Sequence, residues 1–167
     1  MEPIEAAVDH VRGVGDHLIV EYGDYECPYS RMAYREIERL EKRLNRGIRF
    51  AFRHFPLTEI HPHALAAAAA AEAAALQGRF WEMHEVMYHH QESLEPDDLS
   101  RYAAKMGLDV ARFDGDRTSE GVLARVRRDV QSGTASGEVL GTPTLYIDGD
   151  VYRGGYDLAT LLEAVAA

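Results

Sequence analysis

The sequence is short of cysteine: its 167 residues contain one, Cys27. A single cysteine excludes an internal disulfide, and with it the small folds that depend on several disulfides. The chain must then be held together by a hydrophobic core. Hydrophobic residues make up 46% of the sequence, which is enough for one domain of ordinary size. We therefore expect a single domain that carries a free thiol.

Positive charge is also scarce. Lysine and arginine number 18 against 28 aspartates and glutamates, so the formal net charge is −10. A protein this acidic binds nucleic acid or anionic lipid only through a local basic patch. The most basic segment, RLEKRLNRGIR, contains a glutamate that partly neutralises it, and it is typical of a solvated helix face. The composition therefore predicts no nucleic-acid partner.

Long apolar runs are absent as well. About 20 apolar residues are needed to cross a bilayer, and the alanine-rich run Ala64–Ala75 is shorter and contains Glu72. The first residues, MEPIEAAVDHVRG, are acidic and lack the apolar centre of a signal peptide. A mature exported protein that has lost its leader has the same features. We expect no membrane insertion and a cytoplasmic location, with a processed exported form as the alternative.

The first third of the chain predicts a strand, a helix and a second strand. Residues 17–22, HLIVEY, form a short apolar run rich in β-formers. A helix then opens at Cys27-Pro28, since proline suits the first helical position, and residues 45–47 are a typical helix end. The alternation of large apolar residues and arginine over residues 48–55 predicts the second strand. Two strands joined by one helix favour a right-handed, parallel βαβ unit.

The rest of the chain predicts a block of helices and then a return to β structure. The expected helices are residues 62–76, 80–90, 96–106, 109–114 and 118 to about 132. A strand at Thr144–Ile147, a tight turn at Asp148-Gly149 and a partner strand at residues 151–153 follow. Asp157 then caps a last helix. The order βαβ, helical block, ββα predicts an α/β fold in one domain.

Cys27 lies where the first predicted strand passes into a helix. At a helix N-terminus a cysteine meets unpaired backbone N–H groups and the positive end of the helix dipole. Both favour the thiolate, which is the nucleophilic form of cysteine. Free cysteines are also among the residues most often buried and inert, but the following proline and the strand-to-helix position favour a functional site. Cys27 is therefore the first candidate catalytic residue.

The segment GTPT, residues 141–144, is a second candidate element, because it comes directly before a predicted strand. Pro143 has no N–H group to donate to a sheet. In the cis form its peptide bond would expose the backbone of Thr142 as an edge for an extended peptide. An X-Pro pair before a strand is most often an ordinary turn. The meaning of Pro143 therefore depends on whether it lies beside Cys27 in space.

Five segments together resemble the DsbA-like branch of the thioredoxin superfamily. They are VEYGDYECPYS, RHFPLTEIHPHA, GRFWEMHEVMY, GTPTLYIDG and GGYDLATLLEAV. More narrowly, the chain is similar to the DsbA-type domains that occur alone or fused to bacterial sodium/proton antiporters. The resemblance implies one DsbA-like chain over residues 1–167, with a thioredoxin-like core formed by residues 17–61 and 133–167. It also implies a helical domain, residues 62–132, inserted between the second and third strands.

The resemblance implies thiol–disulfide exchange, in which a first cysteine attacks a substrate disulfide and a second cysteine resolves the mixed disulfide. Cys27 matches the attacking position, and Pro28 and Tyr29 match the intervening residues that tune the thiolate. Thr142-Pro143 matches the loop whose cis-proline faces the cysteine and aligns the substrate. Glu21 falls where the family often keeps a buried acid, whose raised pKa lets it accept a proton. The alternative for Glu21 is a surface position on the strand.

Ser30 departs from the family pattern, which has a cysteine there. Without a second thiol, Cys27 cannot form an internal disulfide or release a mixed disulfide by itself. Thiolate attack still works, and an outside thiol such as glutathione, or a thiol of the substrate, can clear the product. Ser30 is expected to hydrogen-bond the sulfur of Cys27. We predict a monothiol oxidoreductase or isomerase that acts on cysteine-containing proteins or peptides, with glutathione as a candidate co-substrate and no bound cofactor.

Three alternatives stay open at this stage. The chain can be a redox-silent module that binds peptides. Ser30 can be an engineered replacement for the resolving cysteine of a dithiol enzyme, made to trap its partners. Glutathione-dependent isomerases and transferases of kappa type share the fold and use a serine to activate glutathione. In those enzymes the serine usually lies nearer the first position of the motif, where this chain has Cys27.

Eight histidines raise the question of a metal site. His54, His61 and His63 lie close together in the sequence, and His89 and His90 are adjacent. The HPH segment lacks the i, i+4 spacing of a helical zinc motif, and no cysteine or acid completes a recognisable tetrahedral set. We therefore expect no metal, and packing or helix-start roles for these histidines.

Aromatic residues surround the predicted motif. Tyr22, Tyr25 and Tyr29 can either line a peptide groove or pack within the strand and the helix cap. We expect packing for Tyr22 and Tyr25, and exposure for Tyr29 because it lies inside the motif. His84, beside Trp81 on an amphipathic helix, is expected in the core or at a groove.

Overall fold

The computed structural model describes residues 1–166 and contains a five-stranded mixed sheet with the strand order β1-β3-β2-β4-β5. The strands are β1 His10–Gly13, β2 His17–Gly23, β3 Ile48–His54, β4 Thr144–Ile147 and β5 Asp150–Tyr152. Strands β2 and β3 are parallel, and the other neighbouring pairs are antiparallel. The α/β class predicted from the sequence is confirmed.

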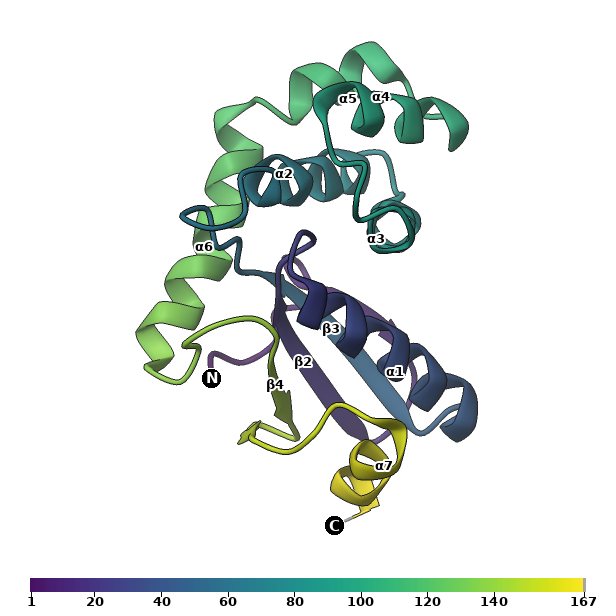
Figure 1. The fold of residues 1–167 in the computed structure, drawn as a ribbon, viewed down its shortest axis with the longest axis vertical. Coiled ribbons are helices and arrows are strands. Elements are labelled where there is room, and N and C mark those ends of the chain that lie inside the picture. The colour runs from purple at the N-terminus through teal and green to yellow at the C-terminus, as the bar shows by residue number, and fades with distance from the viewer. Residues whose placement is uncertain (167) are drawn as a thin grey trace.

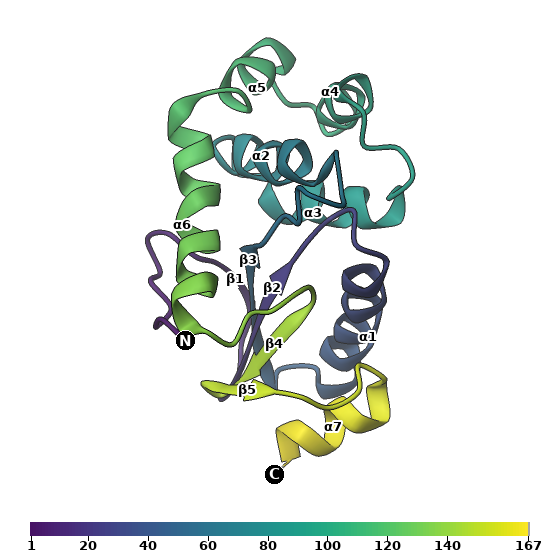
Figure 2. The same cartoon turned by 60° about the vertical axis from the view of Figure 1, so that its left-hand side comes forward.

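Helices cover both faces and one end of the sheet. They are α1 Pro28–Leu44, α2 Ala64–Ala75, α3 Phe80–His89, α4 Pro96–Lys105, α5 Val110–Asp116, α6 Glu120–Ser136 and α7 Leu158–Ala166. Figure 1 shows α2, α3, α4 and α5 stacked beyond one end of the sheet. Helices α1 and α7 lie on one face of the sheet and α6 on the other (Figure 2). Within residues 1–166, none of the helices is long and apolar enough to cross a bilayer.

The unit β2–α1–β3 forms as the sequence predicts. Strand β2 pairs in parallel with β3 along its whole length. The inward face of α1 carries Ala33, Ile37 and Leu40, all fully buried, which is the stripe that an amphipathic helix presents to a sheet. Asn45 ends the helix with φ 56°, a left-handed conformation that asparagine tolerates better than most residues.

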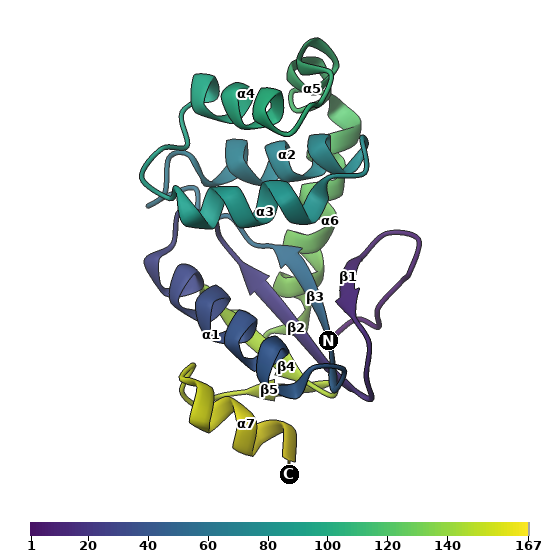
Figure 3. The same ribbon diagram turned by 90° about the vertical axis from the view of Figure 1, so that its right-hand side faces the viewer.

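Strand β1 is absent from the sequence prediction. Its four residues, HVRG, are too few to show an alternation, and the glycines that follow favour a loop. In the fold, β1 pairs antiparallel with the outer edge of β3, with Val11 opposite Ala51 (Figure 3). Because β1 comes before the βαβ unit, the strands counted from the sequence as second and third are β3 and β4, and the helical segment lies between them as predicted.

Helix α2 is the centre of the helical block. Its alanines are nearly all buried, since small side chains let α3 and α6 pack closely against it. Helix α6 leaves the block and runs along the sheet, where a Cβ added at Gly133 would lie 2.9 Å from the ring of Phe55. Helix α6 continues to Ser136. The boundary predicted between residues 132 and 133 thus falls within a helix, and the division into core and insertion stays a prediction.

A buried ion pair joins the N-terminal segment to β3. The side chains of Arg53 and Asp9 are both 0% exposed, and two guanidinium nitrogens donate to the two carboxylate oxygens at 2.9 Å. Arg53 also donates to the Tyr22 hydroxyl and to the carbonyls of Glu2 and Pro3. Burial alone would raise the pKa of Asp9, but the hydrogen bonds and charge of Arg53 outweigh it and lower that pKa.

The substitution Asp9→Ala is expected to destabilise the fold, because it leaves the guanidinium of Arg53 buried without its counter-ion. Removing one partner of a buried pair costs about 3–5 kcal/mol. The measurement is the free energy of unfolding by urea denaturation at neutral pH. Asp16→Ala, at an exposed carboxylate, is the control and should cost less than about 0.5 kcal/mol. Equal losses in the two variants would contradict the structural role of the pair.

Candidate active site

Cys27 lies at the junction of β2 and α1, on the last residue before the helix. Its backbone is extended, with φ −76° and ψ 120°, as at other helix N-caps. Its amide donates to the carbonyl of Asp24, and its own carbonyl accepts from the amide of Arg31, both at 3.1 Å. The sulfur is therefore at the N-terminal end of a 17-residue helix, which is the position that favours a thiolate.

The sulfur of Cys27 faces the loop before β4. Its Sγ donates to the carbonyl oxygen of Thr142 at 3.3 Å, and the peptide bond between Thr142 and Pro143 is cis. The hydroxyl of Tyr156 donates to the carbonyl of Pro143 at 3.0 Å and so ties the loop to the segment before α7. The two candidate elements of the sequence, 115 residues apart, are in direct contact.

Cys27 itself is little exposed. The residue has 3% of its surface accessible, whereas Tyr29 is 63% exposed, as expected, and Pro28 is exposed as well. Access to Cys27 is thus limited, while the two residues that follow it are open to solvent.

Ser30 does not contact the sulfur as expected. It is 0% exposed and lies in the first turn of α1, where its hydroxyl accepts from the amide of Asp24 at 3.3 Å. The predicted hydrogen bond to Cys27 does not form within residues 1–166, because the hydroxyl turns toward the preceding loop and Sγ turns toward Thr142. Ser30 thus holds the loop between strand and helix, and its catalytic role stays a prediction from its position.

Glu21 is a buried acid, which is the first of the two alternatives that the sequence leaves open. It is 0% exposed on β2, and within residues 1–166 neither carboxylate oxygen has a hydrogen-bond partner. Burial raises the pKa of Glu21 to about 8, and the charge of Arg12 opposes the rise. A carboxyl group with this pKa can take up or release a proton near neutral pH. Its role as a proton acceptor for Cys27 stays a prediction.

Tyr88, which is buried, and Tyr156, which is partly buried, lie in the same electrostatic neighbourhood. Burial raises the pKa of both Tyr88 and Tyr156, and the negative charges of Glu21 and Cys27 raise each of them further. The Tyr88 hydroxyl, like the carboxylate of Glu21, lacks a hydrogen-bond partner in the part of the chain that the structure describes. Within residues 1–166, Glu21 and Tyr88 are thus buried polar groups without a hydrogen-bond partner in the protein.

The other two tyrosines near the motif pack inside the protein. Tyr22 and Tyr25 are 0% and 1% exposed, so packing is the correct interpretation and the groove role is wrong for both. The hydroxyl of Tyr25 shares a hydrogen bond of 2.9 Å with Nδ1 of His84. His84 is a core residue, fully buried among aromatic rings, and burial lowers its pKa well below the usual value.

A polar network of two carboxylates and two histidines holds the loop before Cys27, and no sequence pattern predicts which of these residues pair. The carboxylate of Asp24 is 2.7 Å from Nδ1 of His61, and that of Glu26 accepts from the amide of His63 and is 2.8 Å from its Nδ1. Each pair is separated by 37 residues. The histidines of the HPH segment thus pair with carboxylates. Within residues 1–166, no three histidine, cysteine or acidic residues are arranged to hold a metal ion.

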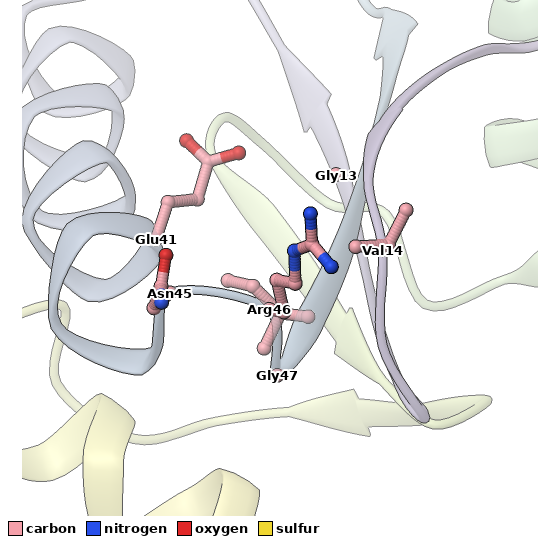
Figure 4. A pocket seen from close by; sticks show the side chains of 7 residues that line it. Gly13, Val14, Glu41, Asn45, Arg46 and Gly47 are labelled. Atoms are coloured by element: carbon pink, nitrogen blue, oxygen red, sulfur yellow. The ribbon is translucent and has the colours of Figure 1, made fainter.

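The pocket drawn in Figure 4 lies at the C-terminal end of α1, whereas Cys27 precedes the N-terminal end of that helix. It has a volume of about 330 Å³ and is lined by residues from the turn after β1 and the end of α1, namely Gly13, Val14, Glu41, Asn45, Arg46, Gly47 and Ile48. Because α1 rises about 1.5 Å per residue over its 17 residues, the pocket is about 25 Å from the sulfur. It is therefore not part of the candidate active site.

Comparison with known sequences gives a match to the DSBA-like thioredoxin domain model over residues 18–166. The chain is 42% identical over 171 residues to the Na(+)/H(+) antiporter NhaA 1 of Mycolicibacterium gilvum, and 41% identical over 167 residues to NhaA 3 of Salinispora tropica. These alignments cover 100% and 99% of this chain but only 28% and 25% of the relatives. The chain thus spans about a quarter of the length of these curated relatives.

Solved structures give a matching result. A thioredoxin-like oxidoreductase from Silicibacter pomeroyi is 27% identical, with a TM-score of 0.83, and the match covers 95% of this chain and 90% of that one. BdbD from Bacillus subtilis has the same TM-score at 21% identity, with 97% and 93% covered, and at this identity the likeness shows the fold alone. The likeness extends over the sheet and the helical block together.

The substitution Glu21→Gln is expected to flatten the pH dependence of stability. The pKa of about 8 in the folded chain lies above the ordinary 4.5, so between these values the folded chain holds a proton that the unfolded chain has lost. This group should make stability fall with rising pH by up to about 1.4 kcal/mol per pH unit. The variant loses that contribution, which urea denaturation at about pH 5 and about pH 8 measures.

Glu59→Gln, at an exposed carboxylate, is the matched control and should keep the wild-type dependence on pH. A fall in stability between the two pH values that is as steep in Glu21→Gln as in the wild type would contradict a protonated, buried Glu21.

Proposed function

The chain belongs to the DsbA-like thioredoxin family, whose members are thiol–disulfide oxidoreductases, and from this premise we propose that it exchanges disulfides through Cys27 alone. The observation that carries the proposal is the contact between the sulfur at the start of α1 and the backbone of the Thr142-Pro143 loop. Ser30 supplies no second thiol. The reaction is therefore a monothiol exchange, completed by a thiol from outside.

In the first half-reaction the Cys27 thiolate attacks a mixed disulfide between a protein and glutathione. A bond forms between the sulfur of Cys27 and that of glutathione, the old S–S bond breaks, and the protein leaves as a thiolate that takes up a proton. In the second, the thiolate of a free glutathione attacks this new disulfide and restores Cys27. The products are a protein thiol and glutathione disulfide, so no internal disulfide is required.

The same attack serves disulfide isomerisation, where a thiol of the substrate releases Cys27. The proposed partners are therefore cysteine-containing proteins or peptides, with glutathione as co-substrate. Exposed Pro28 and Tyr29 mark the side of approach. Ionisation of Cys27 removes the S–H donor from Thr142, and that oxygen is then free to accept from an extended substrate backbone.

Glu21 has the protonation behaviour that the proposal needs. The thiol must lose a proton before attack, and the leaving thiolate must gain one. A carboxyl group with a pKa of about 8, buried below the site, can exchange protons in the range where thiols also ionise. We assign Glu21 the role of proton acceptor and donor during exchange.

A redox-silent module that binds peptides is the second candidate. Two observations favour it: Cys27 is 3% exposed, and Ser30 leaves the motif without a resolving thiol. In this alternative the Thr142-Pro143 loop binds an extended segment of a partner, and the sulfur makes no covalent bond. In the antiporter relatives this domain shares its chain with a longer protein, so the remainder of such a relative is the first partner to test.

The wild-type chain is expected to release glutathione from a glutathionylated peptide when free glutathione is supplied. Cys27→Ser should abolish turnover, because a serine hydroxyl is not ionised at neutral pH and cannot form a disulfide. The measurement is the rate of glutathione disulfide formation in an assay coupled to glutathione reductase. No turnover by the wild type, with equal peptide binding by the wild type and Cys27→Ala, would instead support the binding module.

Restoring a cysteine through Ser30→Cys is expected to give a dithiol site. Position 30 is three residues along the chain from Cys27 and is fully buried. A thiol there would be shielded from solvent and close in the chain to the sulfur with which it would form the disulfide. After incubation with glutathione disulfide, the variant should contain an internal disulfide, whereas the wild type should contain one bound glutathione. Intact mass before and after denaturing alkylation separates the two. A variant that gains two bound glutathiones, and no internal disulfide, contradicts this geometry.

A further inference from the structure

We propose that Gln91 is a positioning residue that holds the backbone of the Cys27 loop from the helical block and thereby sets the reactivity of the thiol. The inference rests on the thiol chemistry proposed for Cys27. Gln91 follows α3 in the sequence, and its side chain reaches the residues that precede α1. It is not part of the motif that marks the family in the sequence.

The side-chain amide of Gln91 donates to two carbonyl oxygens of the active-site loop. Its Nε2 lies 2.8 Å from the oxygen of Tyr25 and 2.9 Å from that of Cys27. A primary amide has two N–H donors, so both are used. The two carbonyls flank Glu26, and the amide therefore spans the last turn of chain before the helix begins.

The carbonyl of Tyr25 depends on this bond. Within residues 1–166, Gln91 is its one hydrogen-bond partner, and Tyr25 is 1% exposed. A buried carbonyl left without a partner is unfavourable. The carbonyl of Cys27, by contrast, also accepts from the amide of Arg31 in α1. Gln91 therefore connects the start of α1 to Tyr25, whose carbonyl has no hydrogen bond to α1 in the described part of the chain.

The residue after Gln91 contacts the same end of α1. The carboxylate of Glu92 accepts from Arg31 at 2.5 Å, across the first turn of the helix. Glu92 is largely exposed, and an exposed ion pair of this kind contributes little energy. The turn at residues 91–92 thus lies against the start of α1. The hydrogen bonds from the partly buried amide of Gln91, and not the exposed ion pair of Glu92, are what fix the loop in place.

Gln91 acts on the sulfur through the backbone. Cys27 keeps Sγ at the amide end of α1 and beside Thr142 only in its extended N-cap conformation. The effect of the helix terminus on a charge falls off within the first turn. A loop freed from Gln91 therefore holds Sγ less steadily near these amides, and the sulfur reacts more slowly near neutral pH.

Several charged or titratable groups lie on the elements around Cys27. They are Glu21 on β2, Asp24 and Glu26 in the loop, Arg31 on α1, His63 at the start of α2, Tyr88 on α3 and Tyr156 before α7. Substitution of Gln91 leaves all of them in place. A changed pH profile of Cys27 in such a variant therefore reports the loss of the amide.

The experiment compares alkylation of Cys27 by iodoacetamide in the wild type, Gln91→Met, Gln91→Glu and Gln77→Met, over a range from about pH 5 to about pH 9. Methionine is similar in size to glutamine but has no N–H donors. Glutamate is also similar in size, but its carboxylate oxygens accept hydrogen bonds and cannot donate them when ionised. Gln77 is the matched control, because its amide also binds backbone, donating to the carbonyl of Asp109 and accepting from its amide. Mass spectrometry gives the rates, and thermal melting follows the fold.

At about pH 6, Gln91→Met should react about threefold more slowly than the wild type, and at about pH 9 the two rates should agree within about twofold. Gln91→Glu should be slower still at the lower pH, because a carboxylate then faces two carbonyl oxygens and adds negative charge near the sulfur. Gln77→Met should keep the wild-type profile even if its melting temperature falls.

A wild-type profile in both Gln91 variants, whatever their melting temperatures, overturns the inference and leaves Gln91 as a structural residue only. A wild-type rate at about pH 6 that is no faster than that of free cysteine rejects the proposed function, and this inference with it. A reactive wild type with unchanged variants rejects the inference alone, so the two failures are distinguishable.

Discussion

The contact between the Cys27 sulfur and the Thr142 carbonyl is the interaction on which the site depends, and the register of the sheet produces it. Strand β2 pairs antiparallel with β4, with Tyr22 opposite Thr144. The chain that leaves β2 and the chain that enters β4 therefore meet at the same end of the sheet. Because β2 is also parallel to β3, a helix must start from that end to carry the chain back. Strand pairing thus places a helix N-terminus, the sulfur of Cys27 and the carbonyl of Thr142 together.

The loop before Cys27 is held from the side of the helical block, by polar contacts that reach Asp24, Glu26 and the carbonyl of Tyr25. Tyr29 in the first turn of α1 and Leu140 in the segment before β4 are by contrast among the most exposed apolar residues of the described chain, at 63% and 84%. Polar contacts give a loop a fixed geometry, whereas exposed apolar side chains favour contact with another molecule. The helical block thus fixes the loop that carries Cys27, while apolar side chains stay exposed on the two segments that meet at its sulfur.

The Arg53–Asp9 ion pair and Glu21 are two buried ionisable sites with opposite hydrogen bonding. Arg53 and Asp9 satisfy one another, and all five guanidinium donors have acceptors, so this pair serves the fold. In the described part of the chain neither oxygen of Glu21 has a hydrogen-bond partner, and burial raises the pKa of this carboxyl group to about 8. An apolar residue would stabilise a core more than an unpaired carboxyl group does. The exception lies on β2, the strand that leads to Cys27, the single cysteine of the chain.

The sequence by itself determined the local elements and the position of the nucleophile. The apolar periodicity of residues 33–44 and Pro28 after Cys27 are sufficient for a helix that starts at the sulfur, because such signals act over a turn or a pleat of the backbone. The same kind of signal identified four of the five strands. Strand β1 was not predicted, because four residues are too few to show the alternation of a strand, and its stability comes from pairing with β3.

Only the tertiary structure decided which groups meet. It buried Glu21, for which the sequence left a surface position open, and it turned Ser30 toward Asp24 instead of the sulfur. It also brought Gln91 to the Cys27 loop across 64 residues. Burial and hydrogen-bond partners depend on segments that are distant in the chain, and no pattern of neighbouring residues encodes those distances. The sequence could therefore locate the candidate nucleophile, while the burial of the residues around it and the contacts that hold its loop came from the packing of the whole fold.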